Sequence, residues 1–288
     1  MSALTLVALV GSGAAAGLLG ALLGIGGGVI IIPLLVLAFG IGFKVAVASS
    51  LIAVVATSTA AGSVYVGKGL ANMRLGMVLE IFTTLGGITG GLLALVIPSG
   101  VLAAVFAGMI VVTAVLMLRG KDPHSSPQKE QEAKQDSGEG HEKAGSLSGS
   151  YYDPFQRRQI HYQAKRLPFG GAISFLAGIL SGMLGVGGGF IKVPAMNLGM
   201  GLPIKVAAAT SNFMIGVTAV SSLFVYFSAG YVHPMIAAPV ALGVTGGALF
   251  GTRIAGRVSP NLLRRILSVL LLVIAVQMVL KSLGVHFG

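Results

Sequence analysis

Long runs without a charged residue dominate the chain. No Asp, Glu, Lys or Arg occurs in Met1–Phe43, in Val45–Gly67 or in Val206–Thr252. A helix rises about 1.5 Å per residue, so about 20 apolar residues cross a hydrocarbon core about 30 Å thick. Each run reaches that length. We therefore expect an all-α integral membrane protein with several spanning helices.

The apolar pattern of the first half of the chain occurs again in the second half. Positions 161 residues apart correspond without a gap, so that Lys44-Val-Ala-Val-Ala-Ser-Ser50 matches Lys205-Val-Ala-Ala-Ala-Thr-Ser211. This self-similarity predicts two homologous membrane repeats. Each copy has about five apolar segments, and those of the first copy are Leu4–Leu23, Val29–Phe39, Val45–Val66, Arg74–Ile97 and Val101–Leu118.

A polar segment separates the copies and gives three predicted regions. Residues 1–118 form the first membrane repeat, 119–168 a charged and largely mobile linker, and 169–288 the second repeat. The linker is too rich in Ser, Gln, Glu, Lys and Gly to bury a core of its own. Its last part, Tyr151–Tyr162, is richer in aromatic residues and is expected to form a short hairpin or to lie at the membrane surface.

The distribution of Lys and Arg favours an inverted relation between the copies. With the linker in the cytoplasm, five passages per copy leave only Lys44 and Lys281 outside, whereas four passages leave six basic residues there. Inversion also places the loop around Lys68 and Arg74 on the linker side, and its counterpart, Ser228–Met235, on the other. We expect a multi-pass protein of the cell inner membrane with a cytoplasmic linker and both termini periplasmic.

Composition agrees with this class and excludes others. The sequence is 55% hydrophobic and 9% charged, with a mean hydropathy of +0.92. The net charge of +11 does not indicate nucleic-acid binding, because nine of nineteen basic residues lie in the linker among seven of the eight acids. The chain has no cysteine, and its histidines lack metal-ligand spacing. We expect no metal and no cofactor.

A glycine triplet interrupts each copy at the same place. Gly26, Gly27 and Gly28 are matched by Gly187, Gly188 and Gly189. A proline, Pro33 or Pro194, follows five residues after the last glycine of each triplet. Each glycine destabilises a helix by about 1 kcal/mol relative to Ala, so a break is expected. The helix that restarts presents free N–H groups to an anion, and two inverted copies would aim two such starts at one central point. Close helix packing is the alternative role of these glycines.

Polar residues near the breaks are candidates for lining a transport path, although Ser and Thr also bond the carbonyls of their own helix. They are Ser49, Ser50, Thr57, Ser58 and Thr59 in the first copy and Thr210, Ser211, Asn212, Thr218, Ser221 and Ser222 in the second. Lys192 follows the second triplet in apolar sequence, whereas its repeat partner is Ile31. A bound anion would offset the cost of burying Lys192, and snorkelling to the interface is the alternative.

Glu80 is the one carboxylate outside the linker. It is a candidate for carrying a coupling proton, and a position at the membrane interface, on the Arg74 side, is the competing interpretation. No carboxylate pair, His-Glu metal pattern or Ser-His-Asp set lies in the apolar segments, so we do not expect an enzyme.

Two blocks of sequence carry a resemblance to a known family. Gly17-Leu-Leu-Gly-Ala-Leu-Leu-Gly-Ile-Gly-Gly-Gly-Val-Ile-Ile-Ile-Pro33 and Gly178-Ile-Leu-Ser-Gly-Met-Leu-Gly-Val-Gly-Gly-Gly-Phe-Ile-Lys-Val-Pro194, each followed by Lys-Val-Ala, resemble the TauE/SafE family of sulfite and organosulfonate exporters. The resemblance implies a membrane exporter of a small sulfur-containing oxyanion. The charged linker does not map onto the family pattern.

The expected partners are a small anionic substrate, the lipid bilayer and no nucleic acid. A homodimer is also possible on sequence grounds, because the pattern from Gly13 to Gly17 suits either internal packing or dimerisation. An accessory membrane subunit without transport activity of its own is the alternative function.

Overall fold

The computed structural model describes residues 3–23, 26–67, 71–119, 147–153, 158–254 and 272–278. Six of the described helices are long and apolar enough to cross a membrane. They are α1 (Ala3–Leu23), α3 (Phe43–Gly67), α4 (Met73–Val96), α7 (Leu167–Leu184), α9 (Ile204–Ser228) and α10 (Pro234–Ile254). A further apolar helix, α5 (Ser99–Arg119), follows α4. The predicted all-α membrane fold is confirmed.

Each copy contains a short broken helix between its first two long helices. In the first copy α2 (Gly28–Pro33) continues into the π-helical turn η1 (Leu34–Ala38); in the second, α8 (Gly189–Pro194) continues into η2 (Ala195–Gly199). The proline lacks the N–H that a regular α-turn needs, so the wider turn begins directly after it. The described elements of the second copy repeat the order of the first. Its fifth predicted segment lies outside the described residues except for 272–278.

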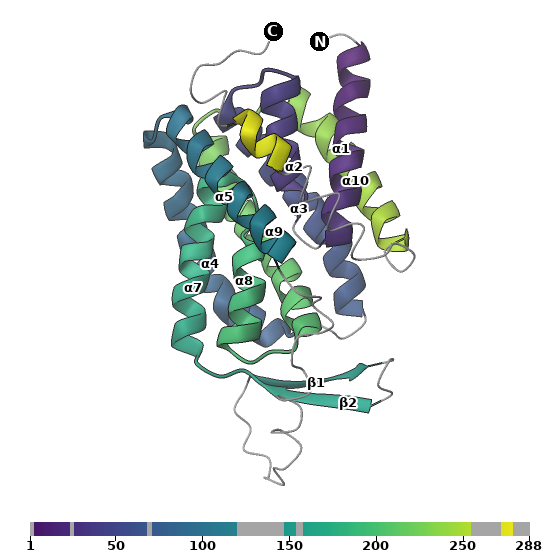
Figure 1. The fold of residues 1–288 in the computed structure, drawn as a ribbon, viewed down its shortest axis with the longest axis vertical. Coiled ribbons are helices and arrows are strands. Elements are labelled where there is room, and N and C mark those ends of the chain that lie inside the picture. Colours follow the sequence, from purple (N-terminus) through teal and green to yellow (C-terminus); the bar gives the residue numbers. More distant parts are fainter. Residues whose placement is uncertain are drawn as a thin grey trace.

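The long helices pair across the copies through glycines. Helix α1 packs along α10, and α4 packs along α7, the corresponding pair. A Cβ atom on Gly13 would lie 2.6 Å from the carbonyl oxygen of Val240, and one on Gly178 would meet the carbonyl of Thr83. The glycine pattern from Gly13 to Gly17 therefore serves internal packing against α10. Figure 1 shows α1 and α10 on one flank and α4 and α7 on the other.

Contacts at the two ends of the bundle fix how the copies relate. At one end Asn72, before α4, reaches Leu147 beside the hairpin, at 3.5 Å from Nδ2 to the carbonyl oxygen. At the other end Lys44 donates to the carbonyl oxygen of Leu95 at 2.8 Å and lies 5.7 Å from the ring centroid of Tyr231. The loop before Lys44 and its counterpart before Lys205 thus lie at opposite ends, since the latter loop packs on the hairpin. Equivalent helices run in opposite directions, as α1 and α7 do in Figure 1.

The end of the predicted linker forms a two-stranded hairpin, β1 (Ser148–Asp153) and β2 (Arg158–Gln163), in which Tyr151 pairs with Ile160. Of the two expectations for this segment, the hairpin is confirmed. Tyr162 is buried against Leu79, Met196 and Met200, so the hairpin covers one end of the second copy. The remainder of the linker, at 120–146, lies outside the described residues.

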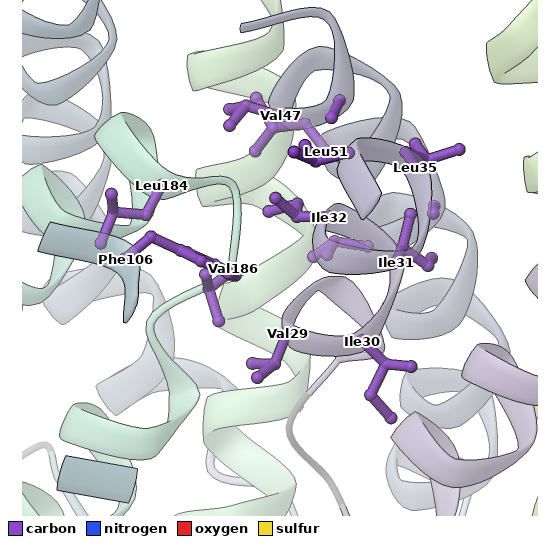
Figure 2. Packing of buried hydrophobic residues seen from close by; sticks show 14 of the residues in the cluster. Val29, Ile30, Ile31, Ile32, Leu35, Val47, Leu51, Phe106, Leu184 and Val186 are labelled. Atoms are coloured by element: carbon purple, nitrogen blue, oxygen red, sulfur yellow. The ribbon is translucent and has the colours of Figure 1, made fainter. Parts of the chain in front are cut away.

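The core surrounds the first broken helix. Every residue of α2 is buried, and Ile32 is fully enclosed. Figure 2 shows its isoleucines beside Val47 and Leu51 of α3, with Val186 and Leu184 approaching from the second copy. Elsewhere large apolar side chains point outward, as Ile81 and Leu85 of α4 do with 62% and 54% of their surface exposed. Such an apolar exterior suits contact with lipid.

Candidate functional site

The two glycine triplets meet near the middle of the protein. A Cβ atom on Gly26 or on Gly187 would approach the same two side chains, Val54 of α3 and Ile215 of α9, which are repeat partners. A Cβ on Gly28 would lie 2.5 Å from the carbonyl oxygen of Gly185. The two breaks therefore lie beside the same pair of side chains. The breaks depend on glycine because Gly26, Gly27, Gly187 and Gly188 all have positive φ angles.

The surroundings of the two breaks are apolar and carbonyl-rich. The first N–H groups of α2 are partly used by the turn itself, since Gly28 donates to Gly26 and Ile30 and Ile31 donate to Gly27. In the second copy Ile191 and Lys192 donate to Gly188 in the same way. The triplets therefore contribute an unusual backbone turn and let the backbones of the two copies come close to each other. Charge has to come from side chains nearby.

The predicted lining residues differ in their hydrogen-bond partners. Ser50 Oγ donates to the carbonyl oxygen of Gly185 at 2.8 Å and so ties α3 to the second break. Ser49 and Ser211 are buried with hydroxyl oxygens that have no hydrogen-bond partner among the described residues. Thr210 lies farther away, towards the hairpin end, where it accepts a bond from the Asn72 N–H at 3.0 Å. Asn212 is buried and accepts a bond from Ser58 through its backbone carbonyl.

A charged cluster lies beside the second break. The Lys192 ammonium donates to Thr218 Oγ1 at 2.9 Å, and Thr218 Oγ1 donates to Glu80 Oε1 at 2.8 Å. Lys192 is 1% exposed and Glu80 6% exposed. The three side chains come from α8, α9 and α4, so the cluster joins the two copies. Thr84 adds a weaker bond to Glu80 Oε1 at 3.3 Å.

The position of Glu80 corrects one sequence interpretation. An interfacial carboxylate on the Arg74 side was the competing expectation, yet Glu80 lies two turns inside α4 and points into the protein. The reason is tertiary. Helix α9 packs along this part of α4, and Gly87 on the same face leaves room for Ser222 and Thr218, so the carboxylate is enclosed. Likewise, Lys192 does not snorkel, because it is fully packed.

Sequence reasoning also missed that Lys192, Thr218 and Glu80 form one unit, and a signal for it was present. At an offset of 161, Lys192 corresponds to Ile31 and Glu80 corresponds to Ala241. Both ionisable residues thus occupy positions where the other copy has an apolar residue. Thr218 corresponds to Thr57, whose hydroxyl bonds carbonyl oxygens of Ala53 and Val54 in its own helix at 3.1 and 3.0 Å. A comparison of the copies at ionisable positions within the apolar segments would have included both residues.

The family model named "Sulfite exporter TauE/SafE" matches residues 9–278. The chain belongs to the TauE/SafE family. This match covers both copies and includes the segment between them, so the resemblance inferred from the glycine blocks is confirmed. As a TauE/SafE protein the chain is a multi-pass membrane transporter and not an enzyme.

Similar proteins carry the names of membrane transporters or of the same family. The chain is 27% identical over 289 residues to the probable membrane transporter protein YunE of Bacillus subtilis, covering 97% of this chain and 99% of the relative. A probable membrane transporter protein of Methanocaldococcus jannaschii is 27% identical, with 92% and 91% covered. A sulfite exporter TauE/SafE family protein of Arabidopsis thaliana is 32% identical over 43% of this chain and 28% of its own length. No solved structure matches.

Proposed function

We propose that this TauE/SafE transporter exports a small sulfur-containing oxyanion, sulfite or an organosulfonate, across the cytoplasmic membrane. The anion would bind near the midplane, beside the paired helix breaks. Candidate contacts are Lys192, Asn212, the hydroxyls of Ser49, Ser50 and Ser211, and the backbone of Gly26–Gly28 and Gly187–Gly189. The proposal depends most on Lys192.

The supporting observation is a buried cation. An ammonium group in an apolar interior is costly unless it is paired and hydrogen-bonded. Lys192 is fully buried, and the one side-chain acceptor described for its Nζ is the neutral hydroxyl of Thr218. A sulfonate or sulfite oxygen would supply a charge-assisted bond there, and such bonds are roughly twice as strong as neutral ones. Ser211 lies two helical turns before Thr218 on the same face of α9, and its hydroxyl, which has no partner among the described residues, offers a further donor.

The orientation in the membrane is part of the proposal. The hairpin end carries Arg74, Lys165 and Arg166 and adjoins the basic linker, whereas the opposite end carries Lys44. By the positive-inside rule the hairpin end would face the cytoplasm, which leaves both termini in the periplasm. A homodimer stays a prediction.

The direct test is binding by the purified protein. Sulfite, sulfoacetate, taurine, thiosulfate and chloride would each be added to detergent-solubilised protein, and the thermal unfolding midpoint and binding heat measured. Stabilisation by one sulfur oxyanion and not by chloride would identify the substrate class and justify flux assays in proteoliposomes. No response to any of these anions, in protein that is folded, would refute the proposal and favour an accessory subunit.

Replacement of Lys192 tests the site. Lys192→Met should weaken binding of the responding anion by at least about tenfold, because a hydrogen bond to a charged group contributes about 1.5 to 3 kcal/mol. The change also leaves Glu80 without its cation, so Lys192→Met combined with Glu80→Gln should be made as well. Ile31→Met, at the equivalent position of the first copy, is the matched control and should bind normally. Unchanged binding in both Lys192 variants would remove this residue from the site.

A further inference from the structure

The charged cluster breaks the symmetry of the molecule. The packing of α8 and α4 on α9 has a counterpart in the packing of α2 and α10 on α3. In that counterpart the positions of Lys192 and Glu80 are occupied by Ile31 and Ala241. Beside both triplets lie Val54 and Ile215, which are apolar. A symmetric site between the triplets would need polar groups on both sides, whereas among the described residues the charged side chains beside the triplets, Lys192 and Glu80, lie on one side.

Net charge constrains what this half can bind. Lys192 and Glu80 together are neutral while both are ionised, and they share Thr218 as a bridge. An added monoanion would leave a net negative charge in a site with almost no exposure to water, and uncompensated buried charge is strongly unfavourable. The favourable way to admit the anion is for the carboxylate to lose its charge. Lys192 then has one anionic partner at a time, either Glu80 or the ligand.

The hydrogen bonds of Thr218 are compatible with either anionic partner of Lys192, the Glu80 carboxylate or the ligand. The single hydroxyl proton of Thr218 lies within reach of Glu80 Oε1 at 2.8 Å and of the Met214 carbonyl oxygen at 3.0 Å. When the carboxylate moves away or is protonated, Thr218 can keep a partner. Glu80 Oε2 is buried and has no hydrogen-bond partner among the described residues, so it is an oxygen on which a proton can reside.

Few other ionisable groups are near enough to substitute for this pair. Helix α7 contains none, and α8 contains only Lys192. Arg74 stands near the start of α4, six residues before Glu80, and is exposed. On α9 the Tyr226 hydroxyl donates to the Met183 carbonyl at 3.1 Å, eight residues beyond Thr218, and the side chain of Lys205 is not described. Glu80 is thus the carboxylate that faces Lys192.

We propose that the anion places its charge beside Lys192, where it replaces the carboxylate of Glu80 as the counter-ion, and that Glu80 takes up one proton from water as it is displaced. This inference rests on the proposed function of the same site. In balance, one monoanion and one proton enter the site together, Lys192 stays protonated, and both leave together on the other side. Transport is therefore electroneutral and independent of membrane potential, so export is driven by the outward gradient of the anion and is opposed by an inward proton gradient.

The binding test uses methanesulfonate or isethionate, because the charge of a sulfonate does not change over the pH range of the assay. Affinity of the unaltered protein is expected to fall as pH rises, approaching tenfold per pH unit at the alkaline end, since binding requires a proton. Glu80→Gln should bind with pH-independent affinity, equal to or tighter than that of the unaltered protein. Glu80→Asp should restore the pH dependence. A pH-independent affinity in the unaltered protein, or the same slope in Glu80→Gln, would overturn the proposal.

The transport test measures whether a proton moves together with the anion, independently of how tightly the anion binds. Proteoliposomes would be loaded with a pH-sensitive dye, given the sulfonate outside, and clamped to chosen potentials with potassium and valinomycin. The unaltered protein should acidify the lumen as the sulfonate enters, at a rate that the potential does not change. Glu80→Gln should carry no protons, and its flux should follow the potential. Potential-driven flux in the unaltered protein would contradict the inference while leaving anion transport intact; no binding of any anion would instead contradict the proposed function.

Discussion

At the scale of single residues, the backbone turn of the second break depends on the absence of a side chain. Gly187 has a φ of 82°, and a Cβ atom there would lie 2.6 Å from Ile215 Cγ2. Gly201 has a similar φ of 75°, yet a Cβ there would meet nothing within 4 Å. The two glycines therefore separate the cost of a left-handed backbone from the cost of a close contact.

Gly187→Ala is expected to lower stability more than Gly201→Ala. A left-handed conformation costs an L-residue about 1 to 2 kcal/mol, which both variants incur. Gly187→Ala also forces overpacking of the central pair, which adds about 1 to 3 kcal/mol. Unfolding midpoints of the two purified variants in the same detergent would be compared. Equal midpoints would show that the turn has room for a methyl group.

At the scale of elements, glycines let α1 and α10 approach each other along their length. A Cβ on Gly247 would collide with the carbonyl oxygen of Ala14, whereas the adjacent Gly246 is exposed on the outer face of α10 and has open space around it. In an apolar solvent, helix association depends on such close packing, because lipid removes the hydrophobic drive between helices.

Neighbouring substitutions on α10 should have opposite effects. Gly247→Ala should separate α1 from α10 and lower the unfolding midpoint, by an amount equivalent to about 1 to 3 kcal/mol of overpacking. Gly246→Ala should leave the contact intact and be neutral or stabilising by up to about 1 kcal/mol, since Ala favours helix over Gly. Circular dichroism melts of both variants would measure this. A drop of similar size for both would mean that the outer face of α10 is also in contact with something.

At the scale of the whole molecule, the ends of the bundle carry opposite features. Gln163 belongs to the hairpin end, where Lys165 donates its N–H to Met200 at 3.0 Å. Ala229 closes α9 at the end where Tyr231 approaches Lys44. Because the chain has no cysteine, single cysteines can report the side of the membrane that each end faces.

Gln163→Cys and Ala229→Cys should be labelled from opposite sides. In intact cells a membrane-impermeant maleimide is expected to react with Ala229→Cys and to reach Gln163→Cys only after the membrane is permeabilised. Both side chains are exposed, so access and not burial decides the result. Labelling of both from outside would exclude the proposed cytoplasmic position of the hairpin, and protection of both would mean that one end is covered.

The sequence by itself determined the membrane class, the repeat, the breaks at both triplets and the family, because each depends on local composition or on matches at a fixed spacing. It could not place Glu80. Lys192 lies 112 positions after Glu80 in the sequence, and Thr218 lies 138 positions after it, so no helical periodicity connects the three residues. Only the packing of α4 and α8 on α9 encloses a carboxylate and an ammonium together. Burial then changes what each group can do, since in water the same pair would be two separate surface charges.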